Sequence, residues 1–96
     1  MENNSETRAL IAEINEDAIL FDGLDKAIIG MSSCDNIPVV VYDVEKIINI
    51  LFEENKAIQP HLSDGVHFES AESFFQYNIE GHYTSENSPI LVYSLR

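Results

Sequence analysis

Three side chains near the middle of the chain have types and a spacing that could support chemistry: Tyr42, Asp43 and Lys46. They lie where a strongly apolar run gives way to a helical pattern, and strand ends beside helix N-termini are common ligand positions in α/β proteins. Asp43 and Lys46 are one helical turn apart and could act as an acid–cation pair. In a small-ligand binder or an enzyme, Asp22 and Glu86 would complete this corner. The structural alternative is that Asp43 caps the helix, Lys46 is solvated and Tyr42 is a half-buried sheet residue.

A second polar group of interest is Asn78, which falls on an apolar helix face beside Phe74 and Phe75. A buried amide needs hydrogen-bond partners. We therefore predict a structural role, in which Asn78 ties its helix to the backbone of residues 83–89. Gly81 is the natural residue to end that helix, because glycine adopts the left-handed conformation at little cost.

Metal and nucleophile chemistry has weak support. The usual ligand types are three histidines and a single cysteine: His61, His67, His82 and Cys34. No pair of them has a recognised short ligand spacing, so we predict no metal site and no Cys–His catalytic pair. Asp22 and Asp25 flank a turn and could hold a hard cation, although solubility of the turn explains them more simply. Because no glycine-rich phosphate loop or serine elbow is present, we predict no cofactor and no catalytic residue.

The elements that must position these residues are organised around residues 37–52. Pro38 can begin a strand that runs to Tyr42, since it lacks an amide donor. Asp43 is a good N-cap for the helix that follows. The apolar face of that helix falls at i, i+3, i+4 and i+7: Val44, Ile47, Ile48 and Leu51.

Further elements are predicted on both sides of this unit. A first helix spans residues 5–16 with Ser5 as its cap, and residues 18–21 form a short strand before the Asp22-Gly23 turn. Residues 27–29 form a strand or a helical turn, and residues 32–36 make a hairpin connection. After a loop over residues 57–68, Ser70 caps a second helix, and residues 89–93 form a last strand.

This order predicts an α+β fold with a small, mainly antiparallel sheet of three to four strands and two to three helices packed on one face. The 96 residues form a single domain, 1–96, in which residues 1–4 are expected to be disordered.

The charge balance excludes several function classes. Seventeen acidic residues and five basic residues give a formal net charge of −12. Nucleic-acid and anionic-membrane binding need clustered Lys and Arg, so we predict neither. A basic protein partner is favoured by complementary fields. The polar N-terminus is unlike a secretory signal, and one cysteine fits a reducing cytosol, so we expect a cytoplasmic protein of a bacterial host cell.

Two parts of the sequence resemble a family of small uncharacterised proteins of bacteriophages and bacteria: DAILFDGLDKAIIG with PVVVYDVEKIINIL, and AESFFQYNIEGHYTSENSPIL. They contain a Y-D-x-x-K strand–helix junction and an F-x-x-N-x-x-G-x-Y helix–loop motif. The matching positions are Asp22, Gly23, Asp25, Ala27, Gly30, Tyr42, Asp43, Lys46, Ala71, Phe74, Phe75, Asn78, Gly81, Tyr83, Glu86 and Pro89. The chain departs from the family at Ser85, where the family usually has Gly, and at Ser88, where it has Thr. The loop over residues 57–68 is also longer than usual. The resemblance implies a fold and a phage context, and no reaction.

Together these features favour a small acidic phage-type accessory protein that binds a host or phage protein and modulates it. Such a protein is expected to expose an apolar or aromatic patch with an acidic rim, and it could self-associate. One alternative is a small-ligand binder or enzyme that uses the Tyr42–Asp43–Lys46 corner, and it predicts a cavity there. Another is a virion or assembly component with large apolar interfaces. A sharper version of the first hypothesis, mimicry of DNA, would need carboxylates gathered on one face.

Overall fold

The computed structural model describes residues 4–80 and 85–95. The elements in chain order are α1 (Ser5–Ile14), the 3₁₀ turn η1 (Asp25–Ala27), β1 (Ile28–Cys34), β2 (Ile37–Asp43), α2 (Val44–Ile58), α3 (Asp64–Phe75), the π-helical turn η2 (Gln76–Glu80) and β3 (Ile90–Val92). The strands form one sheet in the order β1-β2-β3, in which β1 and β2 are antiparallel and β2 and β3 are parallel. The predicted α+β class is confirmed, with a three-stranded mixed sheet and three α-helices.

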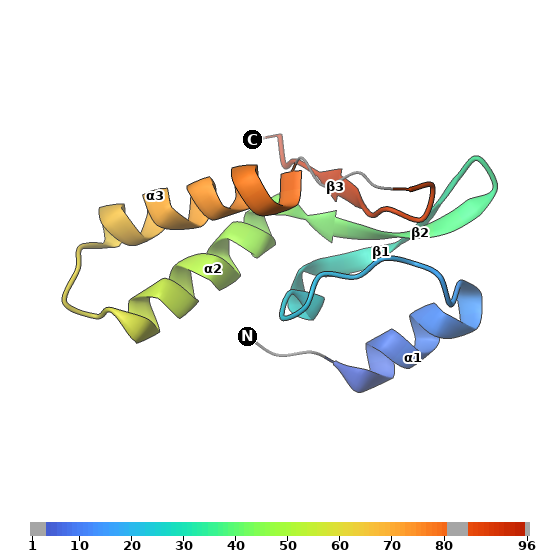
Figure 1. Ribbon diagram of the computed structural model, residues 1–96, viewed down its shortest axis with the longest axis horizontal. Coiled ribbons are helices and arrows are strands. Elements are labelled where there is room, and N and C mark those ends of the chain that lie inside the picture. Colours follow the sequence, from blue (N-terminus) through green and yellow to red (C-terminus); the bar gives the residue numbers. More distant parts are fainter. Residues whose placement is uncertain (1–3, 81–84, 96) are drawn as a thin grey trace.

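The molecule is elongated, with extents of 46 × 26 × 26 Å. Figure 1 shows α2 and α3 side by side as an antiparallel pair that extends from one end of the sheet, while α1 lies below the β1–β2 hairpin. No helix in the described parts of the chain combines the length and apolar character needed to cross a membrane.

The β1–β2 hairpin closes through a two-residue turn, Asp35-Asn36, with Cys34 paired to Ile37. Both turn residues have positive φ, 52° and 68°, as a type I′ turn requires, and Asp and Asn tolerate this conformation better than most residues. The turn is therefore shorter than the predicted connection over residues 32–36, because β1 continues through Cys34.

The β2–α2 junction forms as the sequence predicts. One carboxylate oxygen of Asp43 accepts hydrogen bonds from the backbone N–H groups of Glu45, at 2.9 Å, and Lys46, at 3.3 Å. These bonds satisfy two of the free amides at the helix N-terminus. On the helix itself, Val44, Ile47 and Leu51 are buried.

The core is a single apolar cluster that joins β2, the helices and the segment before β1. Its buried members are Ile11, Leu24, Ala27, Val40, Tyr42, Val44, Ile47, Leu51, Ala71, Phe75 and Ile79. Helix α1 contributes only Ile11 to this cluster. Contacts outside the apolar core are therefore needed to hold α1 against the rest of the domain.

The predicted loop over residues 57–68 is wrong at both ends. Helix α2 continues to Ile58, and α3 begins at Asp64. The Ser63 hydroxyl, rather than that of Ser70, caps α3 by accepting a hydrogen bond from Val66 N–H at 3.3 Å. The additional turn is stabilised by burial of His67 against α2, a tertiary contact that helical periodicity does not reveal.

The N-terminal third also differs from the prediction. Asn4, rather than Ser5, caps α1, and the helix ends at Ile14 instead of residue 16. Asn4 is described, whereas residues 1–3 lie outside the described residues. The predicted strand over residues 18–21 does not form. This segment is irregular chain, in which Ile19 N–H donates to the Asn87 carbonyl at 3.1 Å and Phe21 N–H donates to the Tyr42 hydroxyl at 2.9 Å.

Candidate functional site

The structure does not bring the side chains of the Tyr42–Asp43–Lys46 corner together. Tyr42 is fully buried, and its hydroxyl accepts a hydrogen bond from Phe21 N–H at 2.9 Å. Its ring contacts the Phe21 ring at 5.1 Å between centroids, and burial raises the pKa of its hydroxyl. Asp43 is used as a helix cap and Lys46 is exposed. The arrangement matches the structural alternative, except that Tyr42 is fully rather than half buried.

The other two members of the predicted ligand site do not complete it. The Asp22 side chain is 90% exposed and lies 3.5 Å from the Arg8 guanidinium. Glu86 is exposed in the turn before β3. Neither carboxylate is held in a defined position beside Lys46 by a contact that the structure describes.

Asn78 is exposed, so the prediction of a buried amide is wrong. Its side-chain amide donates to the Phe74 carbonyl at 3.1 Å, within its own helix. Phe75 and Ile79 continue the buried face of α3 at i, i+4 spacing after His67 and Ala71, whereas Phe74 lies beside that face and is 48% exposed. Gly81 lies outside the described residues.

The histidines do not form a metal centre. His67 is buried between α2 and α3, its ring meets Phe52 edge-on at 6.3 Å, and its Nε2 atom has no hydrogen-bond partner among the described residues. His61 is exposed in the α2–α3 loop, and His82 lies outside the described residues. Within the part of the chain that the structure describes, no group of three His, Cys, Asp or Glu residues could hold a metal ion.

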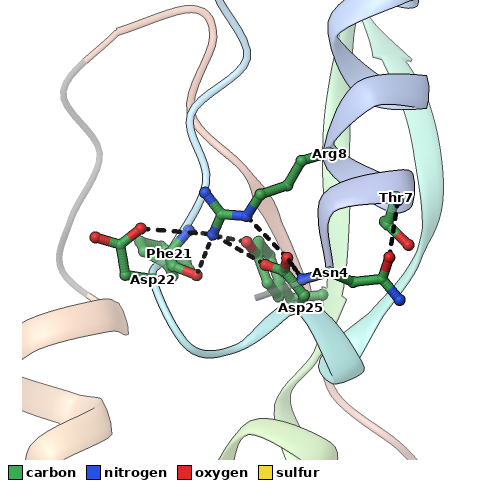
Figure 2. A network of polar contacts seen from close by, with 7 residues as sticks. Asn4, Thr7, Arg8, Phe21, Asp22 and Asp25 are labelled. Atoms are coloured by element: carbon green, nitrogen blue, oxygen red, sulfur yellow. Dashed lines mark hydrogen bonds and ion pairs between the residues drawn. The ribbon is translucent and has the colours of Figure 1, made fainter. Parts of the chain in front are cut away.

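A buried ion pair that the sequence reasoning missed holds α1 in place (Figure 2). The Asp25 side chain is 0% exposed and accepts hydrogen bonds from Arg8 Nε at 2.8 Å, Arg8 Nη2 at 3.0 Å and the Asn4 backbone N–H at 2.6 Å. Burial acts to raise the pKa of Asp25, but these hydrogen bonds and the Arg8 charge outweigh it, so the pKa lies below its ordinary value. The pair is a structural clamp, because each Asp25 oxygen is already occupied.

The strongest candidate for a binding site is a groove of about 370 Å³ along α2, α3 and the chain after β3. We call it the α2–α3 groove, and its lining residues are Val44, Glu45, Ile48, Asn49, Phe68, Tyr93 and Ser94. Val44 and Ile48 are buried or half-buried apolar residues, whereas Phe68 is 44% and Tyr93 53% exposed. The groove therefore offers aromatic side chains that are partly open to solvent beside an apolar helix surface.

Both aromatic side chains of the groove are positioned by a second layer of rings. The Phe68 ring packs edge-on against Phe52 at 6.4 Å, and the Tyr93 ring packs edge-on against Phe75 at 6.4 Å. The Tyr93 hydroxyl also donates a hydrogen bond to Glu80, and this bond, with some burial, raises the pKa of Tyr93. Side chains held in this way lose little conformational freedom when they bind a partner.

Carboxylates lie in the groove and on the helices that line it. Glu45 lines it from α2, and Asp64 and Glu72 lie one helical turn before and after Phe68 on α3. Two cations lie on α2 near these carboxylates: Lys56 stands 3.8 Å from Asp64 with both side chains largely exposed, and Lys46, next to Glu45, is exposed. An exposed pair of this kind is weak, so the Asp64 carboxylate can exchange Lys56 for a cation of a partner.

The sequence reasoning missed this groove because it assigned Phe68 to a loop and Tyr93 to the end of a strand. The available signal was weak: Phe68 stands next to the carboxylate of Glu69, and Tyr93 lies in an uncharged segment. A larger hollow, of about 490 Å³, lies between α2 and the chain around Gly23. Its lining carries charges of both signs, Lys26 with Glu53 and Glu54, so it defines no charge preference.

Comparisons of the chain with protein-family models, curated proteins and solved structures found no match. The fold and the groove define a small acidic α+β protein with an exposed aromatic groove, and the resemblance to phage proteins stays a prediction.

Proposed function

We propose that this protein is a small accessory protein of phage type that acts by binding a protein partner through the α2–α3 groove. The observation that carries the proposal is the exposure of Phe68 and Tyr93 above an apolar floor with Glu45 at its rim. Exposed, pre-positioned aromatic residues are typical of binding hot spots. The phage context, and a role in modulating a host or phage protein, rest on the sequence resemblance alone.

A non-enzymatic role is supported by the hydrogen bonds that the candidate reactive side chains make within the fold. The Tyr42 hydroxyl is occupied by Phe21 N–H, Asp43 caps α2, and Asp25 is saturated by its hydrogen bonds. These groups are therefore engaged in holding the fold. The aromatic side chains of the α2–α3 groove, in contrast, are held by neighbouring rings and still accessible.

The test is affinity capture from nuclease-treated host-cell lysate with three tagged proteins: wild type, Phe68→Gln and Phe74→Gln. Phe74 is a matched control, because it lies on the same helix with a similar exposure, 48% against 44%, and does not line the groove. We expect one stoichiometric protein with wild type and Phe74→Gln, and its loss with Phe68→Gln. Equal recovery with all three proteins, or no partner at all, would contradict the proposal. Light scattering of the free protein tests the virion alternative, which requires a stable oligomer.

A further inference from the structure

We infer that the α2–α3 groove takes a basic amphipathic helix, an inference that rests on the proposed function and specifies the class of its partner. The groove follows the first two turns of α2 and is closed by Phe68 of α3 and Tyr93 after β3, and a third helix packs readily on an antiparallel helix pair, as in helical bundles. Helix-in-groove binding is a common mode of peptide recognition, in which apolar anchors recur at i, i+3, i+4 and i+7.

The backbone of the groove favours a helix over an extended strand. Most of its lining comes from α2 and α3, whose interior N–H and C=O groups are already bonded within each helix. An extended peptide laid on the helical part of this surface would find no backbone partners there. A helix satisfies its backbone internally and presents only side chains to Ile48, Phe68 and Tyr93.

The charge around the groove specifies a cationic helix. Glu45 lies in the groove and Asp64 and Glu72 flank Phe68 on α3, against the exposed cation Lys46 beside the groove, so Lys or Arg next to the apolar anchors would meet carboxylates. The formal net charge of −12 acts in the same direction over longer distances, and it disfavours a second copy of this chain as the occupant.

The test titrates the ¹⁵N-labelled full chain with synthetic peptides of about 16 residues, long enough for four helical turns. The first peptide has Leu at i, i+3, i+4 and i+7 and Lys elsewhere, the second has the same composition in scrambled order, and the third replaces Lys by Glu. We expect the first peptide to shift the amide resonances around Ile48 and Phe68 and to bind at least about tenfold tighter than the other two.

Variants then locate the site. Phe68→Gln is expected to weaken the Leu/Lys peptide by about tenfold or more, and Phe74→Gln by less than about twofold. Glu45→Gln removes an exposed charge without touching the core, and it should weaken binding by a few fold and reduce its salt dependence. Circular dichroism checks that each variant is folded. If Phe68→Gln is unfolded, the result with Glu45→Gln decides the test.

Several results would overturn the inference. These are equal binding of the scrambled peptide, equal loss in Phe68→Gln and Phe74→Gln, the absence of binding, or a dimer of the free protein that Phe68→Gln abolishes. The two proposals fail separately. Phe68-dependent capture of a lysate protein without peptide binding leaves the proposed function standing and removes the basic helix. Groove-specific peptide binding with no Phe68-dependent protein capture supports the basic helix as a ligand and contradicts the proposed function.

Discussion

Removal of the Arg8 side chain is expected to destabilise the whole fold. In Arg8→Ala, the carboxylate of Asp25 stays buried and keeps only the hydrogen bond from Asn4 N–H. Breaking a buried ion pair in this way costs about 3–5 kcal/mol. We expect the lower end, about 3 kcal/mol, because the Arg8 side chain is itself 26% exposed and so is partly screened by water. That is a large share of the roughly 5–14 kcal/mol by which a domain of this size is stable.

Urea unfolding followed by far-UV circular dichroism measures this loss. With a slope of about 1–1.5 kcal/mol per molar urea, the midpoint should fall by roughly 2–3 M while the slope is unchanged. Lys56→Ala is the control, because Lys56 pairs with Asp64 at 3.8 Å on the surface, and its removal should cost less than about 1 kcal/mol. Hydrogen exchange should quicken most in α1, whose one buried side chain is Ile11 among those described.

The pH dependence provides a second check on the same pair. The pKa of Asp25 is lower in the folded than in the unfolded state, so the pair's contribution is fully present above the ordinary Asp pKa of about 4. It is lost as the pH falls through the lower folded-state value. The stability difference between wild type and Asp25→Asn should therefore shrink as the pH falls below about 4. A loss below about 1 kcal/mol in Arg8→Ala at pH 7, or a wild-type advantage independent of pH, would refute this reasoning.

Three further substitutions test individual contacts by urea unfolding. His67→Leu should raise the free energy of unfolding by about 1 kcal/mol, because it replaces a buried imidazole with an unpartnered Nε2 by an apolar side chain of similar size; a clear loss of stability would show that Nε2 is satisfied. Tyr42→Phe leaves Phe21 N–H without its acceptor and should cost about 1–2 kcal/mol, and a neutral result would mean that this bond contributes nothing. Asp43→Ala removes the α2 cap and should cost about 1 kcal/mol without reducing peptide binding in the groove, whereas a selective loss of binding would restore the corner as a site.

Contacts between near neighbours in sequence were predictable. Asp43 caps α2 because its carboxylate reaches amides only two and three residues ahead, so residue type and order suffice. The buried face of α2 follows from helical periodicity in the same way. The α+β class could be predicted because it depends on the order of such local elements.

Contacts between distant residues were not predictable. Arg8 and Asp25 are separated by 17 positions, and no local pattern relates them. The residue type and its place at the strand–helix junction pointed to Tyr42 as a ligand group, yet the hydroxyl is turned inward to Phe21 N–H, 21 positions away. The parallel pairing of β3 with β2 likewise depends on the chain returning along the sheet after α3.

The sequence by itself determined the acidic charge, the β2–α2 unit and the class of fold, because composition, capping and periodicity act over a few residues. Only the tertiary structure decided which side chains remain accessible. Burial of His67 and Ala71 against α2 sets the rotation of α3, and that rotation places Phe68 beside the chain after β3, where Tyr93 lies. The candidate site is therefore a product of helix packing, which depends on the mutual fit of surfaces that are far apart in the sequence.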